Sequence, residues 1–369
     1  MNTSPKKVVF AINDFTYGGA QRLYIDLFEA LGPQEFEIHL ISLMDFPDKQ
    51  DLFKEVPAHV QVHRFHFKNV KDLGEWLRLI KELRKINPAV AVTSLFFTNT
   101  VLRVLKPLIG YRVIAIEHNT YEKKTRFHIF IDRLLSHLTQ TIVAVSETVR
   151  TFTSKQEKIP LEKFCVIHNG VDIERIEHIL RQVDVSTLRR ELGLSKDDKI
   201  IINVGRLTRQ KNQGALIEAF AEFSQKYPQY KLLILGEGKL MDEYVSLIHE
   251  LRVEKTIRLL GVRKDVIACC MLADFFVSAS HIEGLSVAQI EALVCSLPIL
   301  TTKTSGADEM IREGENGYFM EATTGDIYAG LERMVNADLD HMRIQARETA
   351  KRYDIKKTAH AYADLMIHL

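Results

Sequence analysis

The sequence is poor in cysteine and contains no long apolar run. Its four cysteines show no metal-ligand spacing, so we expect reduced thiols and neither a zinc site nor a disulfide framework at Cys165, Cys269, Cys270 and Cys295. No apolar segment approaches the length that spans a bilayer, and the residues after Met1 lead into an expected strand instead of a secretory signal. We therefore expect a cytoplasmic protein.

The chain also has no large excess of one charge, since its 369 residues include 49 Lys and Arg and 48 Asp and Glu. The charge is unevenly spread, because residues 1–190 carry a net +5, the remainder −4, and residues 64–133 hold 14 basic and 6 acidic residues. This basic segment is open to two interpretations: it binds an anionic membrane surface or a phosphate-bearing acceptor, or it forms solvated helix faces. No basic stripe is interleaved with aromatic residues, so nucleic acid is not an expected partner.

Short β-branched runs alternate with amphipathic helical runs along the whole chain. This alternation is typical of parallel sheets with helices on both faces. It pauses near residues 175–197 and restarts, and the chain is too long for one ordinary core, so we predict an α/β protein of two doubly wound, Rossmann-like domains facing across a cleft. The expected strands are 7–12, 37–43, 60–65, 89–94, 112–117, 141–145, 163–167, 199–204, 231–235, 257–260, 275–277 and 299–301, and the expected helices include 73–86, 213–226 and 239–251.

Two groups of residues follow expected strands in the first half. Gly18 and Gly19 open a helix after a polar loop, where glycine lets the backbone approach a ligand and free N–H groups favour an anion. His118 ends the strand 112–117 and can donate to a sugar hydroxyl or carry a proton near neutral pH. Taken alone, paired glycines are more often a turn, and a histidine in a loop is more often held by backbone groups.

Acidic and basic residues follow expected strands in the second half. Arg206 and Lys211 can converge on a diphosphate, the first as a planar fork and the second as a point charge. Glu283 lies in the turn after 275–277, and Glu291 lies about two helical turns further on. This spacing suits a ligand with a polyol and a phosphate that lies on the helix N-terminus. Each pair alone is more often explained by ordinary surface residues.

Together, these features resemble family 4 of the nucleotide-sugar-dependent glycosyltransferases, the group 1 type with the GT-B fold. The resemblance covers nearly the whole chain. Its most specific element is the pair Glu283 and Glu291, reinforced by Gly205, Arg206 and Lys211 about eighty residues earlier. The segments that carry the resemblance are 17–22, 117–119, 145–147, 168–172, 204–212, 283–292 and 305–309.

The resemblance implies a role for each matched residue. Glu291 would bind the ribose hydroxyls, and Arg206 with Lys211 would bind the diphosphate. Glu283 would hold hydroxyls of the transferred sugar, and His118 would contact that sugar near the reacting carbon. The other residues expected to bind the donor are Gly18, Gly19, Gly205, Arg263, Gly284, Leu285, Ser286 and Val287.

The family also implies a domain arrangement and a mechanism. An acceptor-binding domain over 1–180 would be joined by a crossover helix at about 352–369, and a donor-binding domain would cover 195–351. Members transfer with retention of configuration, without a cofactor or bound metal, by front-face attack in which the leaving phosphate takes the acceptor proton. Metal-dependent transferases usually carry Asp-x-Asp after a strand, whereas here it occurs only as Asp338-Leu339-Asp340 in a helical tail region, where we expect a surface role.

The expected reaction moves a hexose or N-acetylhexosamine, commonly from a UDP-sugar, to a glycan or polyprenyl-diphosphate-linked acceptor. Such a reaction belongs to polysaccharide, lipopolysaccharide or glycoconjugate synthesis at the inner face of the cell membrane. Ser286 and Val287 differ from the residues found in many members, which leaves the donor open.

Three other functions are weighed against this one. A catalytically silent homologue would be favoured by loss of Arg206, Lys211 or either glutamate, and none is lost. An epimerase would turn over the donor without an acceptor. A nicotinamide dehydrogenase would need the fingerprint G-x-G-x-x-G, which is absent.

Overall fold

The computed structural model describes residues 4–46, 50–69, 71–122 and 124–369. The chain divides into two compact units, the first made of Met1–Gly170 with Ile355–Leu369 and the second of Val171–Asp354. None of the described helices is long and apolar enough to cross a membrane.

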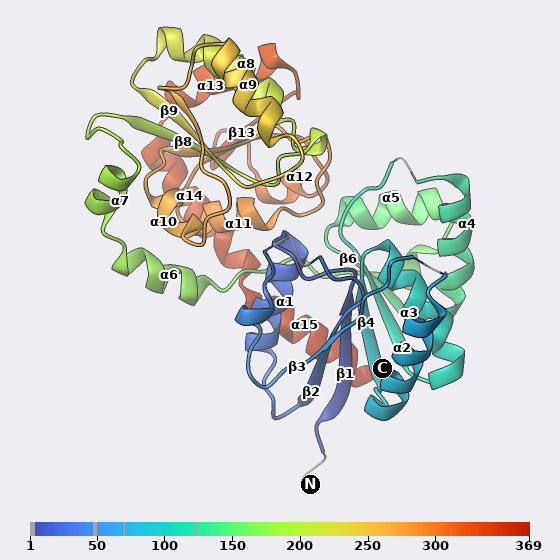
Figure 1. The fold of residues 1–369 in the computed structure, drawn as a ribbon. Coiled ribbons are helices and arrows are strands. Elements are labelled where there is room, and N and C mark those ends of the chain that lie inside the picture. The colour runs from blue at the N-terminus through green and yellow to red at the C-terminus, as the bar shows by residue number, and fades with distance from the viewer. Residues whose placement is uncertain (1–3, 47–49, 70, 123) are drawn as a thin grey trace. The chain divides into compact units, whose positions relative to one another are not determined.

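The first unit is built on a seven-stranded parallel sheet in the order β3-β2-β1-β4-β5-β6-β7 (Figure 1). Its central strands are apolar and buried on both faces, as expected for a parallel sheet covered by helices. The order reverses between β1 and β4, so the sheet is doubly wound. The strands are β1 (Lys6–Ile12), β2 (Phe36–Ser42), β3 (Gln61–Arg64), β4 (Val90–Ser94), β5 (Arg112–Glu117), β6 (Thr141–Ala144) and β7 (Phe164–Val166).

Helices cover both faces of this sheet. Helix α1 lies on one face and α2 to α5 lie on the other, and the C-terminal α15 packs against α1 (Figure 1). The helices are α1 (Gly19–Ala30), α2 (Leu73–Ile86), α3 (Phe96–Ile109), α4 (Arg126–Leu135), α5 (Glu147–Glu157) and α15 (Ile355–His368), with short 3-10 turns η1 (Phe53–Glu55), η2 (Ser136–Leu138) and η3 (Leu161–Lys163).

Helix α2 illustrates how local sequence sets an element. The Asp72 side chain accepts a hydrogen bond from Glu75 N at 3.4 Å and begins the helix, and Asn87 ends it in the left-handed conformation at φ 50°. Leu79 and Leu83, four residues apart, are buried against the sheet. The observed bounds match the expected helix 73–86.

The second unit holds a six-stranded parallel sheet in the order β10-β9-β8-β11-β12-β13, which reverses between β8 and β11. Its strands are β8 (Lys199–Val204), β9 (Tyr230–Leu235), β10 (Ile257–Leu259), β11 (Phe275–Ser278), β12 (Ile299–Thr302) and β13 (Gly317–Met320). Its helices are α6 (Ile173–Gln182), α7 (Val185–Glu191), α8 (Gln213–Lys226), α9 (Met241–Glu250), α10 (Val266–Met271), α11 (Val287–Val294), α12 (Ala307–Met310), α13 (Thr324–Val335) and α14 (Leu339–Ala350), with η4 (Arg209–Lys211) and η5 (Lys351–Tyr353).

Two features differ from the sequence-based expectation. Strand β13 was not predicted, because it is a four-residue edge strand that opens with Gly317 and has no long apolar run. The first unit ends at Gly170 instead of residue 180, because α6 packs on α10 and α11 of the second unit. The expectation of two doubly wound α/β domains is confirmed.

The Asp-x-Asp segment lies at the start of α14. Asp338 caps this helix by accepting a hydrogen bond from His341 N at 3.0 Å. Asp340 is exposed and pairs with Arg343 at 3.0 Å. Both aspartates therefore have local structural roles in the second unit.

Candidate functional site

Lys211 and Glu283 form an ion pair where the second sheet reverses direction. Their loops follow β8 and β11, which are neighbouring strands, and ligands of doubly wound sheets bind at this position. The Ser280 hydroxyl donates to the same oxygen, Glu283 Oε1, at 3.0 Å. Glu283 is only 9 % exposed, yet within the described residues its other oxygen, Oε2, has no hydrogen bond. One carboxylate oxygen thus remains available to a ligand hydroxyl.

Two hydrogen bonds, one between backbone groups and one from a side chain, hold these two loops together. His281 N donates to Gln210 O at 2.8 Å, and Gln210 Nε2 donates to Ile282 O at 2.8 Å. Gly205 lies beside Lys211, since a Cβ there would be in van der Waals contact with Lys211 Cε at 3.4 Å. Gln210 and Ser280 were not predicted from the sequence, although polar residues at the two strand ends were the available signal.

Arg206 places a second cation on the loop that carries Lys211. The residue is exposed, and its guanidinium has no hydrogen bond or ion pair with the described residues. Its carbonyl accepts a hydrogen bond from Gln213 Nε2 at 3.1 Å, which fixes the backbone at the start of α8. The loop therefore carries two paired cations, Lys211 and Arg209, and one unpaired cation, Arg206, which is suited to an anionic ligand.

The N-terminus of α11 follows directly after Glu283. Ser286 is its N-cap but makes no side-chain capping bond, and no acid lies in the first turn. Gly284, Leu285 and Val287 are buried, so Val287 can serve a polar ligand only through its backbone. Gly306 packs against this turn with φ 89°, and a Cβ there would lie 2.7 Å from Gly284 O.

Glu291 and Arg263 both interact with neighbouring residues of the second unit. Glu291 is half-buried on α11, and its charge contributes to the raised pKa of the Cys270 thiol, whose main cause is a hydrogen bond with Cys295. Arg263 donates twice to Asp265, at 2.8 and 2.6 Å, and to Glu191 at 3.2 Å. Its guanidinium is therefore already engaged by two carboxylates, and its role in donor binding stays a prediction.

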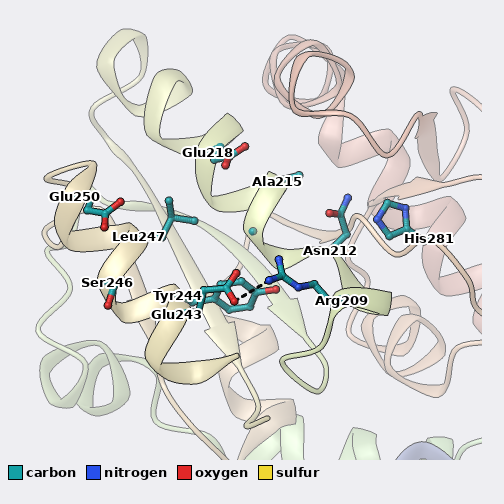
Figure 2. Close-up of a pocket in the computed structure, with 11 residues that line it drawn as sticks. Arg209, Asn212, Ala215, Glu218, Glu243, Tyr244, Ser246, Leu247, Glu250 and His281 are labelled. Atoms are coloured by element: carbon teal, nitrogen blue, oxygen red, sulfur yellow. Dashed lines mark hydrogen bonds and ion pairs between the residues drawn. The ribbon is translucent and has the colours of Figure 1, made fainter. Parts of the chain in front are cut away.

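A cavity of about 740 Å³ lies between α8 and α9 (Figure 2). It borders the Lys211 and Glu283 loops through Asn212 and His281, but none of the described residues lining it belongs to the predicted set. Figure 2 shows the 2.9 Å ion pair between Arg209 and Glu243 within this cavity. The predicted site therefore lies beside this cavity, at the strand ends.

His118 lies in the first unit directly after β5. Its Nε2 is 3.1 Å from Ser94 Oγ at the end of β4, and Tyr24 Oη is 2.6 Å from the same hydroxyl. Burial lowers the pKa of His118 to about 4, so the imidazole is neutral at pH 7. It can then accept or donate a hydrogen bond without carrying charge.

Gly18 and Gly19 begin α1 after β1, the strand next to β4. Gly18 is the N-cap, and α1 has neither a side-chain capping bond nor an acid in its first turn. The Gln21 side chain beside them donates to Asp14 O at 3.1 Å. In the first unit, the two glycines follow β1 at the point where the sheet reverses. The His118 loop follows β5, the next strand after β4, and reaches the reversal through its contact with Ser94 at the end of β4.

A buried ionic cluster that was not predicted from the sequence lies close to the His118 loop. Lys124 pairs with Asp132 at 2.9 Å, with Glu157 at 2.5 Å and with Glu117 at 3.8 Å, and Arg103 pairs with Asp132 at 2.8 Å. These five residues, here called the Lys124 cluster, bring together three carboxylates and two cations. They tie the loop after β5 to α3, α4 and α5.

Comparison with known proteins relates both units to glycosyltransferases. Residues 17–175 match the family described as "Glycosyltransferase Family 4", and residues 184–353 match "Glycosyl transferases group 1". A Campylobacter jejuni N-acetylgalactosamine-N,N'-diacetylbacillosaminyl-diphospho-undecaprenol 4-alpha-N-acetylgalactosaminyltransferase is 28 % identical, covering 93 % of this chain and 94 % of the relative. An Escherichia coli UDP-Gal:alpha-D-GlcNAc-diphosphoundecaprenol alpha-1,3-galactosyltransferase is 24 % identical, covering 84 % and 82 %.

Solved structures agree on the fold. Anabaena HepE, crystallised in complex with UDP-glucose, matches with a TM-score of 0.83 and 20 % identity over 98 % of this chain and all of HepE. The two doubly wound units and these matches confirm the predicted architecture and enzyme class. The chain belongs to the family 4, group 1 glycosyltransferases, and it is a glycosyltransferase of the GT-B fold.

Proposed function

We propose that this enzyme transfers a hexose or N-acetylhexosamine from a UDP-sugar to a glycan carried on a lipid diphosphate. The observation that carries the proposal is the Lys211–Glu283 pair at the reversal of the second sheet, with Arg206 unpaired beside it. Support for the donor comes from HepE, which binds UDP-glucose. Support for the acceptor comes from the Campylobacter and Escherichia relatives, both named for diphospho-undecaprenol-linked substrates.

The charges of this site suit a nucleoside diphosphate sugar. Arg206 binds the diphosphate as a fork, and Lys211 turns from Glu283 toward the phosphates when the donor enters. Glu283 Oε2 accepts a hydrogen bond from a hydroxyl of the sugar, and the Glu291 carboxylate accepts hydrogen bonds from the ribose hydroxyls. Cations aimed at the phosphate where charge builds up in the transition state lower the barrier most.

The transfer step follows from these roles. The acceptor oxygen forms a bond to the anomeric carbon while the bond from that carbon to the diphosphate oxygen breaks. The acceptor proton passes to the leaving phosphate, and UDP departs. We propose front-face attack, which retains the configuration, with Arg206 and Lys211 in place of a metal ion and neutral His118 as a hydrogen-bond partner of the sugar.

Single substitutions with a matched control test this assignment. We expect Arg206→Ala and Glu283→Gln to abolish transfer. Arg209→Ala should preserve it, because Arg209 lies on the same loop as Arg206 but its guanidinium is held by Glu243 of α9. The assay follows a radiolabelled sugar from a panel of UDP-sugars onto a polyprenyl-diphosphate glycan. Unchanged unfolding temperatures establish that the variants fold.

Three outcomes would contradict the proposal. Wild-type turnover in Arg206→Ala or Glu283→Gln would remove the roles assigned to those side chains. Activity lost in EDTA and restored by Mg²⁺ would exclude the metal-independent step. Donor conversion without acceptor would indicate an epimerase or a hydrolase. The donor itself is identified by the nucleotide sugar that most raises the unfolding temperature, because a bound ligand stabilises the folded state.

A further inference from the structure

Exposed apolar side chains are concentrated on three adjacent helices of the first unit. Helix α3 contacts both α2 and α4, and all three lie on the same face of the sheet (Figure 1). Of the fifteen large apolar side chains exposed in the described part of the chain, seven lie on these helices. We call their outer surface the three-helix face. Soluble proteins rarely expose such a grouping without a binding partner.

Helix α4 shows the pattern most clearly. Phe127 and Phe130 are 67 % and 61 % exposed, and Leu134 lies one turn further along the same side of the helix. The opposite side carries the buried Asp132 and Leu135. On α2, Leu73 and Leu77 are 74 % and 70 % exposed, and α3 adds Val104 and Leu108.

The charge of the three-helix face is positive. Six basic side chains are exposed on α2 and α4, namely Arg78, Lys81, Arg84, Lys85, Arg126 and Arg133. The described residues of the three helices include no fully exposed acid: Glu75 pairs with Arg78, Glu82 pairs with Lys85, and Asp132 is buried in the Lys124 cluster. Exposed aromatic and aliphatic residues are therefore combined with four cations that form no ion pair with the described residues, namely Lys81, Arg84, Arg126 and Arg133.

We propose that the three-helix face docks on an anionic lipid bilayer. Apolar side chains enter the boundary between headgroups and acyl chains, while nearby Lys and Arg side chains meet lipid phosphates. Charge favours this partner over a second copy, because a symmetric dimer through the face would bring the same four unpaired cations of each copy together. The inference deepens the proposed function, since an acceptor on a lipid diphosphate lies at such a surface.

The Lys124 cluster holds the docking helix in place. Asp132 of α4 is bonded to Arg103 of α3 and to Lys124, so α4 is fixed from its inner side. A rigid helix loses little conformational freedom when its outer side chains bind. Docking therefore needs no rearrangement of the described backbone.

Vesicle flotation with the full-length protein tests the inference without donor or acceptor. The two arms are vesicles of phosphatidylcholine alone and of phosphatidylcholine with phosphatidylglycerol. We expect binding to the second, weakened by salt. Phe127→Gln/Phe130→Gln and Arg126→Gln/Arg133→Gln should each lower the partition coefficient by about tenfold or more. Matched controls on the second unit, Val245→Gln/Ile344→Gln and Lys196→Gln/Lys255→Gln, should bind like wild type.

Each other outcome overturns the inference. Equal binding to both vesicle types, no binding to either, or binding unchanged by both α4 variants would show that this face does not dock on anionic lipid. A wild-type dimer that dissociates in Phe127→Gln/Phe130→Gln would identify a second copy as the occupant. Because no substrate is present, these results are independent of the transfer assay, and failure of one proposal leaves the other measurable.

Discussion

Removing Lys124 should destabilise the first unit strongly, and more at alkaline than at acidic pH. Its ammonium lies among Asp132, Glu157 and Glu117, all nearly buried. Lys124→Met would leave three buried carboxylates with one cation, Arg103. Breaking a buried ion pair by removing one partner costs about 3–5 kcal/mol, and we expect a loss of this order near pH 8.

The pH dependence follows from the proton balance of the Lys124 cluster. Burial and the neighbouring Glu117 carboxylate raise the pKa of Glu157 to about 8. Burial alone would lower the pKa of Lys124, but its three acidic neighbours outweigh this effect and raise it. The folded state therefore keeps a proton on Glu157 that the unfolded chain releases above its ordinary carboxyl pKa. Stability from this proton is complete in acid and falls by a few kcal/mol as pH rises toward 8.

The chain's single tryptophan makes the measurement specific. Trp76 lies on α2, so its fluorescence during urea unfolding reports the first unit alone. Wild type should lose stability between pH 5 and 8, Glu157→Gln should show a flatter profile, and Lys124→Met should be nearest to wild type at pH 5. Equal slopes for wild type and Glu157→Gln, or a Lys124→Met loss that does not vary with pH, would refute the reasoning.

Two further predictions concern the site. Because burial lowers the pKa of His118 to about 4, the pH profile of kcat/KM should show no inflection from His118 between pH 6 and 8; an inflection in this range that His118→Gln removes would contradict this. Gly306→Ala should raise KM for the donor and lower stability by about 1–3 kcal/mol, since its φ is 89° and the new methyl would lie 2.7 Å from Gly284 O. Gly325→Ala, with nothing within 4 Å, is the control, and equal behaviour of the two variants would exclude strain at Gly306.

The strands were predictable where burial on both sides makes the sequence continuously apolar. Segments such as Arg112–Glu117 and Lys199–Val204 were predicted with their observed bounds for this reason. Strand β13 was not predicted, because an edge strand needs fewer apolar residues and its first residue, Gly317, is typical of a turn. The boundary at 170 was not predicted, because α6 belongs to the second unit through its contacts with α10 and α11. The amphipathic pattern of α6 shows that it packs on something but not on which unit.

The site was predictable as a set of strand ends, but not in its pairings. Lys211 and Glu283 were each predicted to follow a strand and to bind the donor, but their ion pair was not predicted. The sequence could not show that Ser280 shares Glu283 Oε1, because that bond depends on how a short loop turns. The Lys124 cluster could not be predicted for a similar reason. Its members come from four elements and a loop, and each alone has the sequence context of a surface residue.

The placement of α15 makes the order of synthesis matter for folding. The second unit is a continuous insertion between Gly170 and Ile355, yet the helix that completes the first unit follows it in the chain. Thr358 Oγ1 donates to His168 O at 3.0 Å, and Lys6 Nζ donates to Met366 O at 2.6 Å, so the two ends of the first unit meet only in the finished molecule. On the ribosome, the second unit can close while the α1 side of the first remains uncovered. A chain stopped after residue 354 would therefore have a complete second unit, but the apolar surface of the first unit that α15 covers would be exposed and prone to aggregation.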